Sequence, residues 1–426
     1  MKKLLITMLL FSLVVTGCGK NSKPQVENKE PQQSAEAVST PEVVDESQQS
    51  GEEGTVFTDS NQITGLAKQI LSNMTLEEKV GQMFLVNLES LDDTEGTFFE
   101  HRKITKRMKK NLEQYSVGGV ILFSRNIETR EQTIKLNSDL QSNSNIPLWI
   151  SVDEEGGDIA RIGNNPNMKT TQFPPMEVVG STEGEEYCYN MGKTIGTEIS
   201  QLGFNLDFAP VADVRTNERN TEIGNRSFGS NPELVAKLSS AVVKGMQSTG
   251  VSSTLKHFPG HGDAEGDTHK SSVNIGSDIN RLRNVDFVPF KEGIKAGADF
   301  MMISHISISR VAGNTLPASL SPLVMKDIVR TELGFNGVVI TDAMDMKAIT
   351  SKYSAGDAAL KAINAGADVV LVPADFVEAY NRVVNAVIHG DMEESRIDES
   401  VQRILEMKIK RGLILSNTDL IYKKSK

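Results

Sequence analysis

Short apolar runs recur between about residue 61 and residue 416, and they limit the possible folds more than any other feature of the chain. Each run is rich in Val, Ile, Leu or Phe, which is typical of a strand buried on both faces. Between the runs lie segments whose apolar residues recur at helical spacing, such as 184–203 and 232–250. Strands that alternate with helices pair in parallel through right-handed crossovers. The sequence therefore predicts an α/β fold.

The number of runs selects the architecture. They are QMFLVNL, GGVILF, PLWISVD, FNLDFAP, SSTLKHF, DFMMISH, GVVITDA and ADVVLVP. Eight βα units over about 350 residues are typical of a (β/α)₈ TIM-type barrel with insertions in its loops. The main alternative is a doubly wound open sheet, which ordinarily has a Gly-rich phosphate loop after its first strand. QMFLVNLESLDD contains no such loop, so we predict a single barrel.

Ionisable residues stand at or near the ends of five of these runs. The carboxyl ends of the strands of a parallel barrel meet at one rim, where catalysis takes place. A buried charge needs a partner or a function, and five such positions in register favour an active site over separate structural ion pairs. The residues are Asp153, Asp207, Lys256 with His257, His305 and Asp342.

The first 17 residues have the features of a secretory signal peptide. Two lysines precede the apolar stretch 4–15, and Val-Thr-Gly-Cys18 resembles the bacterial lipobox, in which the cysteine is lipidated. Residues 18–60 are rich in Gln, Glu, Ser and Pro, which predicts a disordered acidic tether. We expect a lipid anchor on Cys18, a folded domain over 61–426, and a location on the outer face of the cytoplasmic membrane.

Composition excludes some partners and leaves others open. The net charge of −11 argues against nucleic acid, because a phosphate-binding surface needs clustered basic residues. With Cys18 lipidated, Cys188 is the one remaining cysteine, and its helical apolar spacing predicts a buried thiol. No pattern indicates a cofactor. We expect a monomer, although the sequence does not determine the oligomeric state.

The stretch KHFPGHGDAEGDTHKSS, residues 256–272, concentrates groups that transfer protons or bind metals. His257, His261 and His269 would be the ligands if the loop bound zinc. The spacing of the first two does not fit a zinc-protease helix, because Pro and Gly interrupt it and Phe258 stands where that pattern needs Glu. A catalytic acid/base loop accounts for more of the residues, and we expect its glycines to let His269 move.

Several blocks of the sequence resemble glycoside hydrolase family 3, and in particular its bacterial β-N-acetylglucosaminidases. KHFPGHG followed by DTH resembles the signature loop of that branch, and VVITDAMDM resembles the strand that carries the nucleophile. VDEEGGDIARI, DFAPVADV and IGNRSFGSNP resemble three further blocks, and all the blocks follow one another as they do in the family. The likeness extends from about Met74 to Leu415.

The resemblance implies a role for individual residues. Asp342 matches the catalytic nucleophile, His269 the general acid/base, and Asp267 the partner of that histidine. Asp158 stands where the family often has Arg, which puts contacts to the leaving group in doubt. The residues that match those holding the N-acetylglucosamine ring are Asp153, Arg161, Arg226, Lys256 and His257.

The implied reaction is removal of a terminal N-acetylglucosamine with retention, through a glycosyl-enzyme on Asp342. A histidine can donate a proton to the leaving oxygen and later accept one from water, because it titrates near neutral pH. Larger relatives draw acid/base residues from a second domain, whereas here the loop with His269 would supply them. Using a histidine would also lower anionic repulsion, which suits a neighbouring sugar that bears a carboxylate.

Several alternatives stay open at this point. Peptidoglycan fragments and chitin oligomers are both candidate substrates, and phosphate could replace water as the second nucleophile. A sugar-binding lipoprotein without catalysis is one competing function, and a zinc-dependent hydrolase on a similar barrel is another.

Overall fold

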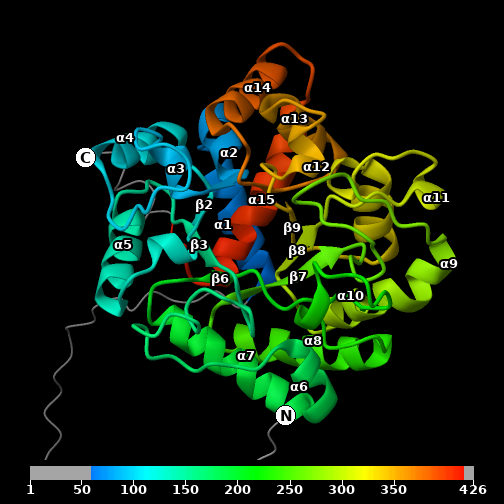
Figure 1. Ribbon diagram of the computed structural model, residues 1–426. Helices are drawn as coiled ribbons and strands as arrows, with labels where there is room; N and C mark the ends of the chain where they lie inside the picture. Colours follow the sequence, from blue (N-terminus) through cyan, green and yellow to red (C-terminus); the bar gives the residue numbers. More distant parts are fainter. Residues whose placement is uncertain (1–58, 417–426) are drawn as a thin grey trace, which may run out of the picture. The chain divides into compact units, whose positions relative to one another are not determined.

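The computed structural model describes residues 59–416, and it confirms the predicted eight-stranded barrel (Figure 1). Each apolar run supplies one strand, and every neighbouring pair is parallel in the order β10-β1-β2-β3-β6-β7-β8-β9. The ring closes where Ile340 bridges to Val369, beside β10. The strands are β1 (Phe84–Val86), β2 (Gly119–Ile121), β3 (Trp149–Val152), β6 (Leu206–Asp207), β7 (Ser252–Phe258), β8 (Phe300–Ile303), β9 (Val338–Thr341) and β10 (Val370–Leu371).

Helices follow every strand and surround the barrel. A short antiparallel hairpin, β4 (Glu154–Gly156) with β5 (Ile159–Ala160), lies between β3 and its helices. The main outer helices, in chain order, are α4 (Lys106–Tyr115), α5 (Arg130–Ser142), α7 (Glu185–Ser200), α8 (Pro232–Gln247), α10 (Phe287–Lys295), the π-helical η5 (Leu323–Glu332), α13 (Ala355–Ala365) and α14 (Phe376–Ile388). Shorter helices in the connections are α3 (Leu88–Leu91), η1 (Ser124–Asn126), α6 (Met176–Thr182), η2 (Gly224–Arg226), α9 (Ile279–Arg281), η3 (Leu282–Asp286), α11 (Ser309–Ala312), η4 (Ala318–Leu320) and α12 (Lys347–Thr350).

The barrel interior is a packed core rather than a channel. The Trp149 ring of β3 meets the Phe300 ring of β8 edge to face, with 5.2 Å between centroids. Both side chains are buried, as are the residues of all eight strands. The predicted thiol is confirmed: Cys188 of α7 is buried, and burial raises its pKa to about 12. A filled interior leaves the rims as the places where ligands can bind.

Helices close the amino-terminal end of the barrel. Figure 1 shows α15 (Glu394–Lys410) beside α1 (Ser60–Leu71), and the two helices are in contact. The Lys408 amine of α15 donates to the Gln82 side chain at 2.7 Å and to the Gly118 carbonyl at 3.0 Å, near the starts of β1 and β2. This end is therefore blocked, and the opposite rim is free to hold a site.

The predicted signal peptide, the lipidated Cys18 and most of the predicted tether lie outside the described residues. The helix α1 begins at Ser60, and Asp59 caps it through its carboxylate. Among residues 59–416, no helix combines the length and apolar character that a bilayer span needs.

Candidate active site

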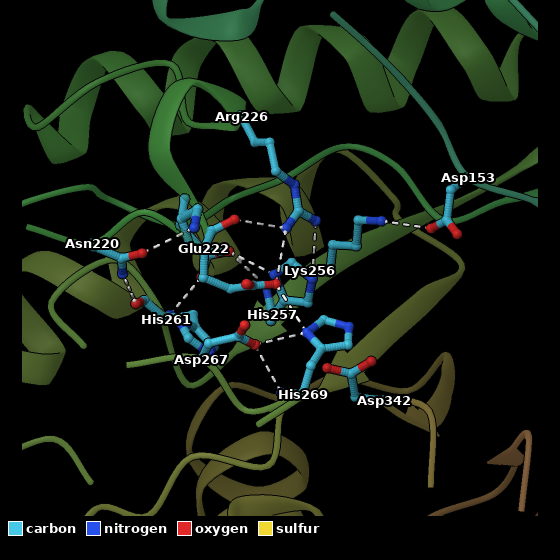
Figure 2. Close-up of polar contacts among 12 residues, drawn as sticks. Asp153, Asn220, Glu222, Arg226, Lys256, His257, His261, Asp267, His269 and Asp342 are labelled. Carbon is cyan, nitrogen blue, oxygen red and sulfur yellow. Dashed lines mark hydrogen bonds and ion pairs between the residues drawn. The ribbon is translucent and has the colours of Figure 1, made fainter. Parts of the chain in front are cut away.

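A cavity of about 200 Å³ opens at the carboxyl ends of the strands. All the predicted site residues within the barrel line it, except Asp267, which lies behind His269. Figure 2 shows most of these side chains, though not Arg161, converging from separate parts of the chain. Those that line the cavity are Asp153, Arg161, Arg226, Lys256, His257, His269 and Asp342, together with Glu155, Glu222 and His261.

One wall of the cavity is a network of buried charges. The Lys256 amine lies 2.9 Å from the Asp153 carboxylate and 2.6 Å from that of Glu155. The Arg226 guanidinium binds both Glu155 oxygens, at 2.7 and 2.9 Å. Burial alone would raise the pKa of Glu155, but Arg226 and Lys256 lower it to about 2. The network therefore stays charged, and it presents fixed donors and acceptors to a polar ligand such as a sugar.

The β4–β5 hairpin places Arg161 near this wall. The Glu154 carboxylate accepts from the backbone N–H groups of Ile162 and Gly163, at 2.7 and 2.8 Å. These bonds fix the turn that carries Arg161, whose guanidinium lies 4.0 Å from the Asp153 carboxylate. The hairpin thus gathers the predicted ring-binding residues Asp153 and Arg161 at one side of the cavity.

His257 is held in one orientation by Asp213. Nδ1 of His257 lies 2.7 Å from Asp213 Oδ2, and Nδ1 is the donor because a carboxylate only accepts. The backbone N–H of His257 donates to the same carboxylate at 3.2 Å. In the neutral ring Nε2 is then the acceptor, and the Arg226 guanidinium approaches it to 3.4 Å. The ring edge that faces the cavity is consequently fixed.

Asp342 stands directly after β9, at the floor of the cavity. Its Oδ1 accepts from the backbone N–H of Ala343 at 2.8 Å. Burial would raise the pKa of this carboxyl, but the neighbouring His305 and His257 and the Ala343 N–H hold it below its usual value. An ionised carboxylate on a rigid strand end is suited to attack on an anomeric carbon.

His269 lies on the long loop after β7 and faces two carboxylates through one ring nitrogen. Nδ1 is 3.0 Å from Asp267 Oδ1 and 3.1 Å from Glu222 Oε1. In Figure 2 the ring lies between Asp267 and Asp342. The hydrogen bond to Glu222 raises the pKa of His269 to about 9. Burial opposes this rise, and the charges of Glu222 and Asp342 add to it. The predicted pairing of His269 with Asp267 is therefore present, with Glu222 as an unpredicted third member.

Two of the ionisable residues at or near the ends of the apolar runs, Asp207 and His305, lie beneath the cavity; the sequence did not decide between rim and core for His305. Asp207 is fully buried in β6, accepts from the Glu154 N–H at 2.9 Å, and has its pKa raised by burial. His305 is also fully buried; its Nε2 donates to the Ala343 carbonyl at 2.8 Å, and its Nδ1 lies 2.7 Å from the Ser319 hydroxyl. Both support the residues above them, and neither lines the cavity.

The glycines of the β7 loop do not all serve as hinges. A Cβ at Gly262 would stand 2.0 Å from the Val214 carbonyl oxygen, and one at Gly260 would stand 2.8 Å from Asp286 Cβ. These two glycines allow close packing, which anchors the first half of the loop. His261 lies between them and is buried, and its backbone N–H donates to the Asp213 carboxylate at 2.6 Å. Only Gly266, with φ of 138°, stands in the exposed second half that carries His269.

The three histidines of the zinc hypothesis do not converge. His257 uses Nδ1 to bind Asp213, and neither ring nitrogen of His261 has a partner among the described residues. Within residues 59–416, the group whose donor atoms could reach one cation is Glu222, Asp267 and His269, all within 4.8 Å. Both carboxylates of this group face the same Nδ1 of His269.

Asp158, which departs from the family pattern, has a structural contact. Its Oδ2 accepts from the Asn225 side chain at 2.8 Å. The bond ties the β4–β5 hairpin to the segment that carries Arg226, so an acidic residue has a use at this position.

Sequence reasoning missed three acidic residues of the site. Glu155 lies in the same block as Asp153, and Asp213 lies in the block after β6. A search for carboxylates to pair with Lys256 and His257 would have found both, because buried charges need partners. Glu222 gives no comparable signal, since it meets His269 only through the folding of two separate loops.

Comparisons with known proteins identify the family and the fold of the chain. The family "Glycosyl hydrolase family 3 N terminal domain" matches residues 75–407. Beta-hexosaminidase A of Pseudoalteromonas piscicida is 35% identical over 327 residues, which cover 70% of this chain and 54% of that protein. The beta-hexosaminidase of Stenotrophomonas maltophilia (strain R551-3) is 36% identical over 283 residues, covering 63% and 80% of the two chains.

A solved structure has a similar fold. The glycoside hydrolase family 3 beta-N-acetylglucosaminidase from Paenibacillus sp. str. FPU-7 superposes with a TM-score of 0.75 at 36% identity. The match covers 80% of this chain and 63% of that one. The chain thus spans about half of the first curated relative and most of the second. With nearly all of the barrel matched, the chain belongs to glycosyl hydrolase family 3.

Proposed function

We propose that the protein is an exo-acting, retaining β-N-acetylglucosaminidase. The observation that carries the proposal is that Asp342 and His269 face the same cavity, whose other wall is the charged network of Asp153, Glu155, Arg226 and Lys256. Pockets for drug-sized ligands are roughly 300–1,000 Å³. This cavity of about 200 Å³ is smaller, so it suits a single terminal sugar ring. The beta-hexosaminidase names of the relatives support the same activity.

The reaction would proceed in two displacements. An oxygen of Asp342 attacks the anomeric carbon, while His269 gives its proton to the leaving glycosidic oxygen. His269, now neutral, then accepts a proton from water as that water attacks the same carbon and Asp342 leaves. Each step inverts the centre, so the product retains the β configuration.

The network that binds the ring should also select the substrate. A site built to pair hydrogen-bonding groups rejects an analogue that lacks them. We expect 4-nitrophenyl β-N-acetylglucosaminide to be hydrolysed with at least about tenfold higher kcat/KM than the β-glucoside, on the same reasoning. Equal or better hydrolysis of the glucoside would overturn the assignment.

The same assay separates the competing functions. A sugar-binding lipoprotein would bind the N-acetylglucosaminide and release no nitrophenol. A zinc-dependent hydrolase would lose activity in the presence of a strong chelator, whereas a carboxylate-histidine mechanism would keep it. Replacing water by phosphate in the second displacement would give N-acetylglucosamine 1-phosphate, which identifies a phosphorylase directly.

The choice between peptidoglycan fragments and chito-oligosaccharides rests on comparison of the two substrates. The sequence favoured an acidic neighbouring sugar because a histidine replaces a carboxylate at the acid/base position. Glu222 and Asp267 place two carboxylates beside that histidine, so this argument is weaker than the sequence suggested. Higher kcat/KM on a disaccharide that ends in N-acetylmuramic acid than on chitobiose would establish the peptidoglycan fragment as the substrate.

We also propose that the chain is anchored to the outer face of the cytoplasmic membrane through a lipid on Cys18. The signal-like segment 1–17 and the lipobox-like sequence support this location. Cys18→Ala should move the protein from the membrane fraction to the soluble fraction, with the activity per molecule unchanged. Membrane attachment that persists in this variant would contradict the proposal.

A further inference from the structure

Glu222 has no role in the two displacements described above, yet it contacts the acid/base residue. It reaches His269 from a different part of the chain, the segment after β6, whereas Asp267 belongs to the same loop as His269. Asp267 alone would be enough to orient the ring, in the way that one aspartate orients the histidine of a serine-protease triad. A second carboxylate on the same Nδ1 therefore needs its own explanation.

Glu222 is itself fixed to the ring-binding cluster. Its backbone carbonyl accepts from Arg226 Nη1 at 3.1 Å, and its carboxylate lies 3.9 Å from the same guanidinium. Arg226 in turn binds Glu155 and so belongs to the charged wall of the cavity. Glu222 thus connects a rigid wall to an exposed loop, since 60% of the His269 side chain is accessible to solvent.

The contact has an electrostatic consequence. Two anionic acceptors on Nδ1 stabilise the imidazolium over the neutral ring. They also leave Nε2 as the nitrogen that can reach a glycosidic oxygen, because Nδ1–H is already held. The raised pKa of His269, for which Glu222 is the main cause, agrees with this geometry.

We propose that Glu222 is a positioning residue that, with Asp267, holds His269 by Nδ1 and biases it toward its acid form. The first displacement, which needs a proton donor, is then favoured over the second, which needs a base. This inference rests on the proposed function, because it concerns the same two steps. It assigns Glu222 no contact with the substrate.

The direction of the pH effect follows from the two steps. Formation of the glycosyl-enzyme needs the imidazolium, so kcat/KM on a substrate with a poor leaving group falls as pH rises through the His269 pKa. Hydrolysis of the glycosyl-enzyme needs the neutral ring, so kcat on an activated aryl substrate rises through the corresponding pKa. The charged or titratable groups that face His269 from neighbouring elements are Asp267, Lys270, Glu222, Arg226, His257, His305, Asp342 and Asp345.

The test is a pair of pH profiles on Glu222→Gln, with Glu218→Gln as the matched control. Gln keeps the shape and an acceptor oxygen but removes the charge, while Glu218 is an exposed residue of the same segment. We expect both limbs, kcat/KM on chitobiose and kcat on the 4-nitrophenyl glycoside, to move about one unit to lower pH, as loss of a nearby opposite charge implies. The Glu218 variant should keep the wild-type profiles.

A structural role for Glu222 would lower both parameters at all pH values and move neither limb, and that result would overturn the inference. Glu222→Asp keeps the charge, so its pH profiles should lie between those of the wild type and those of Glu222→Gln. It is measured in place of Glu222→Gln if that variant does not fold. A chelator that shifts the pH profiles of the wild-type enzyme would also overturn the inference, because a bound cation would then determine the pKa of His269. A wild-type protein inactive on both substrates would instead refute the proposed function.

Discussion

The two ends of the barrel both contain buried charges, but they use them in different ways. At the amino-terminal end, Asp299 is held by Lys410 at 2.9 Å and by Arg411 at 2.5 Å. At the carboxyl end, Lys256 is held by two carboxylates in a similar way. The difference lies in what surrounds them: α15 covers the first group, whereas the second lines a cavity.

This difference shows that buried charges alone do not identify an active site. Asp368 at the amino-terminal end binds Arg330, Arg403 and the Ser400 hydroxyl, so its hydrogen-bonding capacity is used within the protein. Among residues 59–416, the Asp342 carboxylate accepts one hydrogen bond, from the Ala343 N–H, and its other acceptor capacity faces the cavity. We therefore expect mutations at one end to change stability and mutations at the other to change catalysis.

The largest effect should come from Asp342→Asn, which removes the nucleophile and nearly nothing else. Loss of a residue on which every covalent step depends lowers kcat by about 10⁴-fold or more in well-studied enzymes. We expect that loss on activated and unactivated substrates alike, with the unfolding midpoint in denaturant close to that of the wild type. A large change in stability without loss of activity would contradict the catalytic role of the carboxyl end.

Asp368→Asn should show the opposite behaviour. The change leaves the partly buried Arg330 and Arg403 without their buried counter-charge, and breaking a buried ion pair typically costs about 3–5 kcal/mol, which is an upper bound for this partly exposed group. Denaturant unfolding should report this loss, while kcat/KM per folded molecule should stay within about twofold of the wild type, as expected for a distant site. A selective loss of activity would show that the amino-terminal end takes part in catalysis.

A smaller effect should appear in the pH dependence of stability at Lys408. Burial lowers the pKa of its amine to about 7, from 10.5 in the unfolded chain, and a neutral amine has two N–H donors for its two acceptors. Between these pH values the unfolded chain binds a proton that the folded protein does not, so stability rises with pH, by up to about 1.4 kcal/mol per unit. In Lys408→Met this contribution should be absent.

The measurement for Lys408 is the difference in unfolding free energy between wild type and Lys408→Met from pH 7 to pH 9. It should grow in favour of the wild type as pH rises. A difference that is constant with pH would mean that Lys408 is protonated in both states.

Periodicity and spacing were sufficient to predict the barrel, because each strand is buried on both faces and each apolar run is bounded by polar or glycine-containing segments. The same reasoning placed Asp153, Lys256, His257 and Asp342 correctly, since a strand end fixes where its side chains lie. Asp207 also stands at the end of its strand, β6, but its side chain is fully buried and does not line the cavity.

Other parts of the site depend on the folding of loops, which strand periodicity does not describe. His269 stands well beyond the end of β7 at Phe258; the composition of its loop drew attention to it, but its acid/base role came only from the resemblance to the family motif. Glu222 meets it from another loop, so no spacing in the sequence joins the two. Asp299 and Asp368 precede their strands, and the search for residues at carboxyl ends passed over them.

The central claim is that Asp342 forms a glycosyl-enzyme that His269 helps to make and to hydrolyse. The most direct test is His269→Ala with 2,4-dinitrophenyl β-N-acetylglucosaminide, whose leaving group needs no proton. We predict a burst of dinitrophenol, then slow turnover, with one N-acetylhexosaminyl group attached to the protein at Asp342 by mass spectrometry. Azide, which attacks without a general base, should restore turnover and give the β-glycosyl azide. Equal loss of activity on activated and unactivated substrates, with no labelled protein and no effect of azide, would contradict the account.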